Sequence, residues 1–307
     1  MALAGQAETY VDLPMAGRTY GQVAAPTSWG AVVAGFGAPL LDALAALPAL
    51  RDTSLNVSLT GAVGTGAALG LKAPETRRAL AEALGLNDPG RSWHTDRGPI
   101  LAITDWQGRV MSALSHMAET LIALIGTDRS EIALGSVGGS STMPQKQNPV
   151  GPSAVRALHH LFGGLRTTLH SASVHRDQRD GAAWFAEWMV VPQLTLSVAA
   201  ALNETKDIAA QMKPQPEVMA KALELGGGAV FAEALSFALT QKMTRTAAQS
   251  EAKRIAQQAK SDGGSLQSIA LQAHPDLPST LFDPSQNLGQ APHDARAFAD
   301  RVRSGCA

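Results

Sequence analysis

Apolar residues recur along most of this chain at the spacing of an α-helix. The clearest run covers 100–126, where apolar side chains follow each other at steps of three, four or seven residues and form one stripe: Ile103, Val110, Leu114, Met117, Leu121 and Leu124. The same spacing predicts four further helices: 27–50, 152–175, 184–212 and 231–260. The first of these should kink or break at Pro39, and the last is either one long helix or two stacked ones. Because the alternation typical of strands is weak, we predict an all-α fold, a bundle of long helices joined by short loops.

The carboxy-terminal part of the sequence has a different pattern. Beyond Gly263, short helical pieces alternate with proline and glycine, which indicates a small helical appendage rather than more of the long-helix bundle. Proline and glycine also cluster around 215–228, in "KPQP" and "LGGGA". We therefore predict two regions, a central helical bundle at 1–220 and a carboxy-terminal helical region at 221–307.

The composition is that of a soluble globular protein. Of the 307 residues, 45% are hydrophobic and 17% charged, and the formal net charge of −1 offers no general attraction for nucleic acid or an anionic membrane. The apolar stretch 31–50 contains Asp42 and two prolines, so it fits a buried helix better than a membrane span. The first residues lack the basic and apolar runs of a secretory signal. A single cysteine, Cys306, excludes an internal disulfide framework and a cysteine zinc cage. These features predict a cytoplasmic protein.

One polar loop, "GGSSTMPQKQNPVG" at 138–151, interrupts the helical pattern. Its glycines allow backbone N–H groups to approach an anion, while Lys146 supplies a positive charge and Asn148 a neutral donor. Together these groups could bind a carboxylate and stabilise the charge that develops when a neighbouring C–H loses its proton, with a serine as the base. An ordinary surface loop is the alternative, whereas a phosphate-binding loop lacks its characteristic spacing.

Residues 139–149 resemble the G-S-S-x-M-P-x-K-x-N-P signature of the fumarase/aspartase superfamily, and every fixed position matches. This resemblance implies that Ser140 is the catalytic base and that Lys146 and Asn148 bind a substrate carboxylate and stabilise the aci-carboxylate intermediate. It also places Ser141 and Met143 against the substrate. The reaction implied is proton abstraction alpha to a carboxylate with loss of a beta substituent, or the reverse addition.

Further segments resemble the same superfamily. "GRTYGQVAAPTSWG" (17–30) is similar to its R-T-H-x-Q segment and "GAVGTGAALG" (61–70) to its glycine-rich segment. Three others are most similar to the bacterial 3-carboxy-cis,cis-muconate cycloisomerases: "WHTDR", "AAWFAEW" and "LFDPSQNLGQAP". These enzymes close a tricarboxylic diene into a γ-lactone in protocatechuate breakdown, without a cofactor. The resemblance implies a small polycarboxylate substrate and these further contacts: Arg18, Thr19, Tyr20, Gln22, Thr65, His94 and Arg97.

The sequence departs from the family pattern at two functional places. Tyr20 replaces the histidine of R-T-H-x-Q, and with a pKa of about 10 a tyrosine is a poorer acid, which counts against adenylosuccinate or argininosuccinate lyase activity. A buried structural Tyr20 and a catalytic one are both open. In "HRDQRDG" (175–181), Arg176 and Arg179 are possible anion contacts, although a solvated helix end is the favoured reading. The histidines at 159, 160 and 170 lack a metal-ligand spacing, so we expect no metal.

Superfamily members carry a longer amino-terminal region before R-T-H-x-Q than this sequence does, with a small domain, the first bundle helix and an active-site segment. The central bundle at 1–220 is therefore incomplete by comparison. Members are homotetramers that build each active site from three chains, so we expect the same here. Three functions stay open: a carboxymuconate-type cycloisomerase, another lyase such as one releasing fumarate from adenylosuccinate, and a catalytically silent helical subunit.

Overall fold

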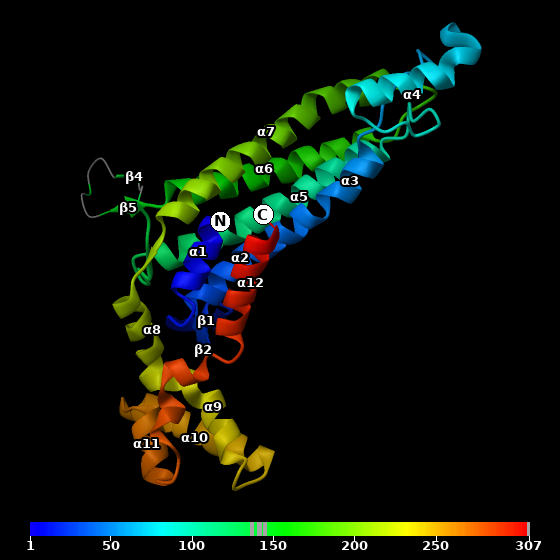
Figure 1. Ribbon diagram of the computed structural model, residues 1–307. Helices are drawn as coiled ribbons and strands as arrows, with labels where there is room; N and C mark the ends of the chain where they lie inside the picture. Colours follow the sequence, from blue (N-terminus) through cyan, green and yellow to red (C-terminus); the bar gives the residue numbers. More distant parts are fainter. Residues whose placement is uncertain (136–137, 140–142, 144–145, 306–307) are drawn as a thin grey trace. The chain divides into compact units, whose positions relative to one another are not determined.

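The structure is a computed structural model that describes residues 1–135, 138–139, 143 and 146–305 (Figure 1). Its α-helices are α1 (Ala2–Thr9), α2 (Trp29–Ala45), α3 (Leu47–Ser54), α4 (Ala73–Leu84), α5 (Gly98–Ile125), α6 (Val150–Ala172), α7 (Gly181–Gln211), α8 (Pro216–Gly228), α9 (Ala232–Leu239), α10 (Arg245–Asp262), α11 (Leu266–Ala273) and α12 (Ala291–Gly305). Short 3-10 helices are η1 (Ala67–Lys72), η2 (Ala229–Phe231), η3 (Ser279–Phe282) and η4 (Pro284–Asn287). The prediction of a mainly α-helical, long-helix fold is confirmed.

A two-stranded antiparallel hairpin was not predicted. β1 (Pro14–Thr19) pairs with β2 (Gln22–Ser28) through a turn at Tyr20 and Gly21, which both have positive φ angles of 51° and 73°. Two such residues match the twist of the flanking strands, which makes this a favourable hairpin turn. The remaining strands are two-residue pairs: β3 (Ile132–Ala133) with β6 (Lys213–Pro214), and β4 (Gly138–Gly139) with β5 (Gln147–Asn148).

The predicted break at Pro39 is wrong in position. α2 continues through Pro39 to Ala45, and a new helix, α3, begins at Leu47. Pro48 stands in the first turn of α3, where its missing N–H has no intrahelical acceptor to lose. The helices predicted over 100–126, 152–175 and 184–212 correspond to α5, α6 and α7, and the range 231–260 forms two helices.

The chain forms two compact units, each assembled from separate stretches of sequence. The first unit comprises 1–38, 121–137 and 208–307, and the second comprises 39–120 and 138–207. The predicted division at residue 220 is continuous in sequence and stays a prediction.

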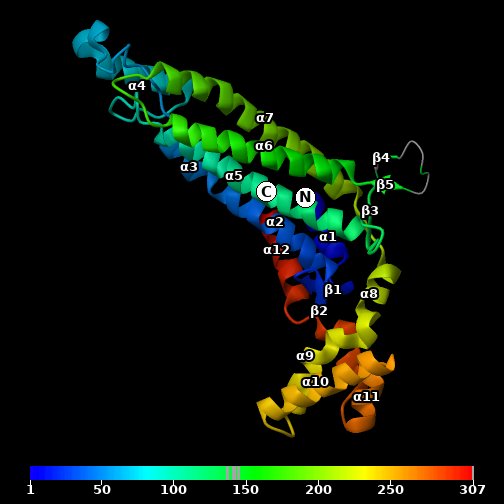
Figure 2. The ribbon, with the colours of Figure 1, turned by 180° about the vertical axis from the view of Figure 1, so that it is seen from behind.

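Long helices make up the second unit, and α5, α6 and α7 lie side by side in it (Figure 2). Trp106 of α5 donates from its ring N–H to the carbonyl of Ala43 at 2.7 Å, and Gln107 donates to Thr195 of α7 at 3.1 Å. The apolar stripe predicted for α5 is buried, apart from Ile103. Buried apolar residues of the three helices α5, α6 and α7 include Val110, Met111, Leu114, Met117, Phe162, Leu169, Leu194 and Val198.

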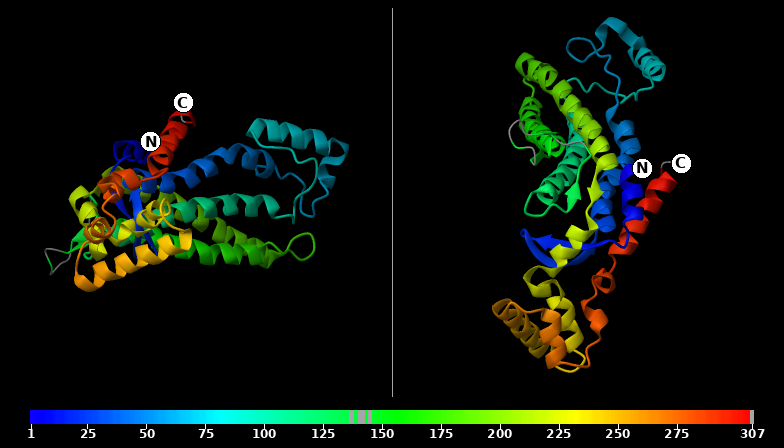
Figure 3. Two further views of the ribbon diagram at one scale, coloured as in Figure 1. Left: turned by 90° about the horizontal axis from the view of Figure 1, so that it is seen from below. Right: turned by 90° about the vertical axis from the view of Figure 1, so that its left-hand side faces the viewer.

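The first unit joins the hairpin to the carboxy-terminal helices. A hydrophobic core built mainly from α8 to α11 also takes in Ala16 of β1; its larger members include Leu223, Phe231, Leu235, Leu239, Ile255, Leu266 and Phe282. α1 and α12 lie side by side (Figure 3), and Arg303 and Arg296 of α12 form ion pairs with Glu8 and Asp12. This pairing holds both ends of the described chain in one unit.

An acidic side chain links α10 to the end of α11. Glu251 accepts two hydrogen bonds of 2.8 Å from Arg254 and lies 3.2 Å from Nε2 of His274. The Arg254 hydrogen bond is the main cause that lowers the pKa of Glu251 to about 2. Because this pKa lies below the ordinary value of 4.5, the stabilisation is complete above pH 4.5 and is lost as the pH falls towards 2.

We expect Glu251→Gln to lower the free energy of unfolding at neutral pH by about 1 kcal/mol, since the carboxylate is only partly shielded from solvent. The difference in unfolding free energy from wild type should shrink as the pH falls from 4.5 towards 2. Urea unfolding curves across that range measure it. The exposed Glu217 of α8 provides the control, whose Gln variant should stay within about 0.5 kcal/mol of wild type. A Glu251→Gln deficit that does not change with pH would contradict the linkage.

Several helices carry exposed apolar side chains. By length and composition alone, three segments could cross a membrane: Trp29–Ser54, Gly181–Gln211 and Pro216–Leu239. Only 33% of the most apolar window of each of the first two is buried within the chain, so the stretch 31–50 is buried on one side only. On α7 the exposed apolar residues are Phe185, Trp188, Met189, Leu196 and Leu202. So many exposed apolar side chains on one helix indicate contact with another apolar surface.

Candidate functional site

An ion pair in the second unit joins the start of α5 to α7. Arg97 donates to both carboxylate oxygens of Glu187, with nitrogen–oxygen distances of 2.8 and 2.6 Å, and the two side chains are only 11% and 10% exposed. The Arg97 guanidinium also lies 5.1 Å from the centre of the Trp93 ring. Two parallel hydrogen bonds between a guanidinium and a carboxylate fix both side chains, so Arg97 has a defined position at the end of the bundle.

A second arginine lies beside this pair. The Nε and Nη2 atoms of Arg179 are 3.0 and 2.8 Å from Nε2 of His94, and its guanidinium carbon is 3.7 Å from the centre of the Trp184 ring. Burial is the main cause that lowers the pKa of His94, and the charge of Arg179 adds to it. With a pKa below its ordinary value, the ring is mainly neutral at pH 7 and adds no charge to the cluster.

The glycine-rich segment 61–66 lies against the same histidine. Gly64 has a φ of 83°, and a Cβ added there would meet Ser92 Oγ at 2.8 Å and His94 Cβ at 3.5 Å. The backbone of Ala62 forms a hydrogen bond with His94. Thr65 is exposed on this segment. Of the predicted substrate contacts, the structure thus brings together His94, Arg97 and the segment of Thr65.

The predicted contacts on the hairpin belong to the first unit. Arg18 forms a two-pronged ion pair with Glu131, a carboxylate whose side chain is 1% exposed. Thr19, Tyr20 and Gln22 are exposed at the hairpin tip, and Tyr20 is fully exposed. Tyr20 is thus not buried within its own chain, and its role stays a prediction. The guanidinium of Arg18 is committed to Glu131, and the role of Arg18 in substrate binding stays a prediction.

A cavity of about 540 Å³ lies beside Arg18 in the first unit. Arg18 and Gln22 line it together with two further basic residues, Arg129 and Lys221, and the acidic Asp128 and Glu131. The sequence pointed only to Arg18 and Gln22, because the others come from 128–131 and α8, far away in the chain. The balance of three basic against two acidic side chains suits a small anion.

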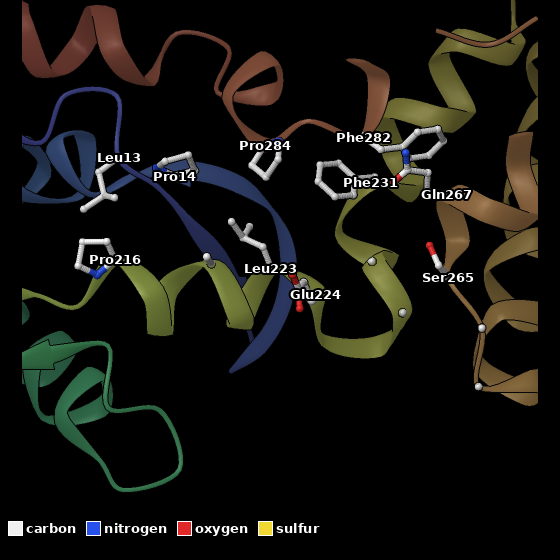
Figure 4. Close-up of a pocket in the computed structure, with 15 residues that line it drawn as sticks. Leu13, Pro14, Pro216, Leu223, Glu224, Phe231, Ser265, Gln267, Phe282 and Pro284 are labelled. Atoms are coloured by element: carbon white, nitrogen blue, oxygen red, sulfur yellow. The ribbon is translucent and has the colours of Figure 1, made fainter. Parts of the chain in front are cut away.

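A cavity of about 700 Å³ in the first unit lies between α8 and the turn before α11 (Figure 4). Phe231 and Phe282 meet edge to face at 6.1 Å on its wall, and Leu223 and Pro284 add apolar surface. Gly227 lets two turns touch, since a Cβ there would lie 2.4 Å from the carbonyl oxygen of Gly264. The sequence marked these glycines only as a domain boundary. None of the predicted site residues lines this cavity.

The signature loop is described in part. Its two ends pair as strands, Gly138 with Asn148 and Gly139 with Gln147, and the Lys146 amide donates to the carbonyl of Met143 at 3.0 Å. Lys146 and Met143 are exposed, whereas Asn148 is half-buried. Ser140 and Ser141 lie outside the described residues. The pairing brings the two ends of the loop together directly before α6.

The loop and the His94–Arg97–Arg179 cluster lie at opposite ends of α6. The loop precedes its first residue, Val150, and Arg179 follows shortly after its last, Ala172 (Figure 1). With 23 residues, α6 is about 34 Å long at 1.5 Å per residue. Lys146 and His94 of the same chain are therefore too far apart to hold one small ligand.

Among the residues that the structure describes, no group of three or more histidines, cysteines or acids is placed to hold a metal. His170 lies 3.3 Å from Asp105, which also pairs with Arg166 at 2.7 Å. His159 and His160 meet edge to face at 6.0 Å. Among the described residues, the buried Nδ1 of His159 has no hydrogen-bond partner.

Comparison with known proteins gives a consistent result. A family model described as a lyase matches residues 1–160. The chain is 34% identical to the 3-carboxy-cis,cis-muconate cycloisomerase of Pseudomonas aeruginosa over 98% of its own length and 67% of that protein. It is 29% identical to the nitrosuccinate lyase of Streptomyces davaonensis over 99% of its length and 67% of that protein. The crystal structure of the 3-carboxy-cis,cis-muconate lactonizing enzyme of Pseudomonas putida matches all of this chain and 70% of that one, with a TM-score of 0.91 and 31% identity. The chain thus spans about two thirds of the length of these relatives.

Proposed function

Because the chain belongs to the fumarase/aspartase superfamily of lyases, we propose that it acts as a 3-carboxy-cis,cis-muconate cycloisomerase. The observation that carries this proposal is the 34% identity to such an enzyme across 98% of the chain. The complete signature at 139–149 and the branch-like segments around Trp93, Trp184 and Phe282 support it.

In the proposed reaction, one carboxylate oxygen of the substrate bonds to a carbon of a C=C bond within the same molecule. The electron pair of that bond moves to the neighbouring carbon, which is alpha to another carboxylate, and the negative charge spreads onto that carboxylate. Lys146 and Asn148 stabilise this aci-carboxylate, and Ser140 delivers the proton to the alpha carbon. The substrate gains one proton, which Ser140 recovers from solvent, and the molecule undergoes no net oxidation or reduction, so the proposed reaction requires no cofactor.

We further propose that each active site combines residues from several copies of the chain in a homotetramer. Lys146 and His94 are separated by the length of α6, so a ligand that contacts both must lie between different subunits. The exposed hairpin tip with Thr19, Tyr20 and Gln22 would supply the third part of the site. Packing between subunits would also cover the apolar face of α7. Such an assembly is proposed to be cytoplasmic.

The proposed function is tested by adding purified protein to 3-carboxy-cis,cis-muconate and following the ultraviolet absorbance of the diene. Lactone formation removes one of the conjugated double bonds, so we expect the absorbance to fall in proportion to the amount of protein. Product analysis by NMR should show a γ-lactone. A stable absorbance with well-folded tetrameric protein would reject the cycloisomerase and favour a catalytically silent subunit.

A second candidate is a lyase that acts on a succinyl compound. The 29% identity to a nitrosuccinate lyase over 99% of the chain favours it, because elimination uses the same carboxylate-stabilising loop. Release of fumarate from nitrosuccinate or adenylosuccinate, with no effect on the carboxymuconate diene, would support this candidate over the first.

A further inference from the structure

The cluster at the end of the second unit contains two arginines and only one carboxylate to pair with them. Glu187 is fully engaged by Arg97, which binds both of its oxygens. Asp180 accepts hydrogen bonds from the amides of Ala182 and Ala183 and lies 3.7 Å from Arg176. Among the described residues, Arg179 has no carboxylate partner within ion-pair distance. The neutral His94 adds no charge, so the cluster has one positive charge in excess.

The side chain of Arg179 is held in place despite that missing partner. The His94 ring contacts its Nε and Nη2 atoms, and the Trp184 ring stacks on its plane at 3.7 Å. Burial is the main cause that lowers the pKa of Arg179, followed by the nearby charge of Arg97, whereas Glu187 opposes the shift. A solvated helix end, the favoured reading from sequence, would leave this arginine in water. Neighbouring Arg176 fits that reading, since its side chain is 81% exposed.

A guanidinium that is fixed, partly desolvated and short of an anion is suited to bind one. Its rotamer freedom is already lost in the unliganded protein, so binding does not have to order it again. Arginine binds carboxylates through two parallel N–H···O bonds. Because His94 contacts Nε and Nη2 of Arg179, a carboxylate must use the other edge of the guanidinium, formed by Nη1 and Nη2. Arg97 competes less for the same anion, because the carboxylate of Glu187 already neutralises its charge.

We propose that Arg179 binds one carboxylate of the ligand at this cluster, and that Glu187 confines Arg97 to a structural role. The identity of the ligand as a polycarboxylate rests on the proposed function, whereas the need for an anion rests on the charges of the cluster. Arg179 thus favours ligands that carry a negatively charged group, and it does so at the end of α6 opposite the signature loop.

The test measures binding of tricarballylate, a saturated tricarboxylate that cannot react, to the full chain by calorimetry and tryptophan fluorescence. We expect Arg179→Gln to weaken binding at least about tenfold, the loss typical of one charge-assisted contact. Arg176→Gln removes the same charge three residues away and serves as the matched control, with an expected change below about twofold. Arg179→Lys should lie between the two, since it keeps the charge but loses the planar fork.

Equal weakening by Arg179→Gln and Arg176→Gln would overturn the proposal, because only general charge would then matter. Wild-type affinity in Arg179→Gln would overturn it as well. Where the Gln variant does not fold, Arg179→Lys decides: a loss of at least about threefold supports the proposal and wild-type affinity rejects it. Arg179-dependent binding without any turnover of carboxymuconate would retain this proposal and reject the proposed function. Turnover with an unchanged KM in Arg179→Gln would do the opposite.

Discussion

Ser140→Ala is expected to lower kcat for lactone formation by about a thousandfold, the middle of the range for losing a positioned proton-transfer group. The reason is chemical: the alpha carbon must gain or lose a proton, and alanine has no group that exchanges one. Stopped-flow or steady-state measurement of the diene absorbance gives kcat and KM separately. KM should change little, because Lys146 and Asn148, the residues proposed to bind the carboxylate, are kept.

The neighbouring Ser141 provides the matched control for this experiment. Ser141→Ala removes a hydroxyl from the same loop and should reduce kcat much less than Ser140→Ala. Circular dichroism and the assembly state of both variants should match wild type, which shows that a loss of activity does not come from misfolding. Full activity of Ser140→Ala would reject Ser140 as the proton-transferring residue, and a large loss confined to Ser141→Ala would move that role to the second serine.

Glu131→Ala is expected to destabilise the protein by about 3–5 kcal/mol, the cost of leaving a buried charge without its partner. Glu131 is 1% exposed and Arg18 12% exposed, so neither charge can turn to solvent without local rearrangement. The pair ties the hairpin strand β1 to the segment before β3. Urea unfolding followed by circular dichroism gives the free energy, provided that the transition is a single cooperative step.

An exposed ion pair of the same unit gives the comparison. Glu8 pairs with Arg303, both side chains being at least half exposed, and Glu8→Ala should cost less than about 1 kcal/mol. The double variant Arg18→Met/Glu131→Leu should recover most of the stability, because it removes both charges and keeps the volume. Its activity then separates two roles of Arg18: full turnover means structure alone, and a large rise in KM means that Arg18 also contacts substrate. A similar small cost for Glu131→Ala and Glu8→Ala would contradict the importance of the buried pair.

The long helices could be predicted because their signal is local. In α5, six apolar residues at helical spacing are enough to define the buried stripe. The hairpin at 14–28 was missed because its strands are short and only partly buried, so they do not alternate in hydrophobicity. The available signal was the turn itself, where Gly21 follows Tyr20 between two runs rich in β-branched and small residues. At Pro39 the general rule for proline predicted a break that α2 does not have.

Only part of the candidate site could be predicted, because some of its contacts join residues that are far apart in the sequence. His94 and Arg97 could be named because they stand in one short segment that resembles a family motif. Glu187 was missed, since its partner Arg97 lies 90 positions away in the chain and only folding brings the two together. A signal was present in "AAWFAEWMVV", where one acid stands alone in an apolar helical run. An isolated charge in such a run needs a buried partner, which is a reason to search for an arginine elsewhere.

α6 sets the distance between the signature loop that precedes it and Arg179, which follows its last residue. Inserting one residue would lengthen it by about 1.5 Å and rotate everything beyond it by about 100°. Neither Lys146 nor Arg179 would be replaced, yet in the proposed assembly one of the two would no longer reach its proposed site. In the proposed assembly, the length of α6 is therefore a requirement of its own, in addition to the chemistry of the loop.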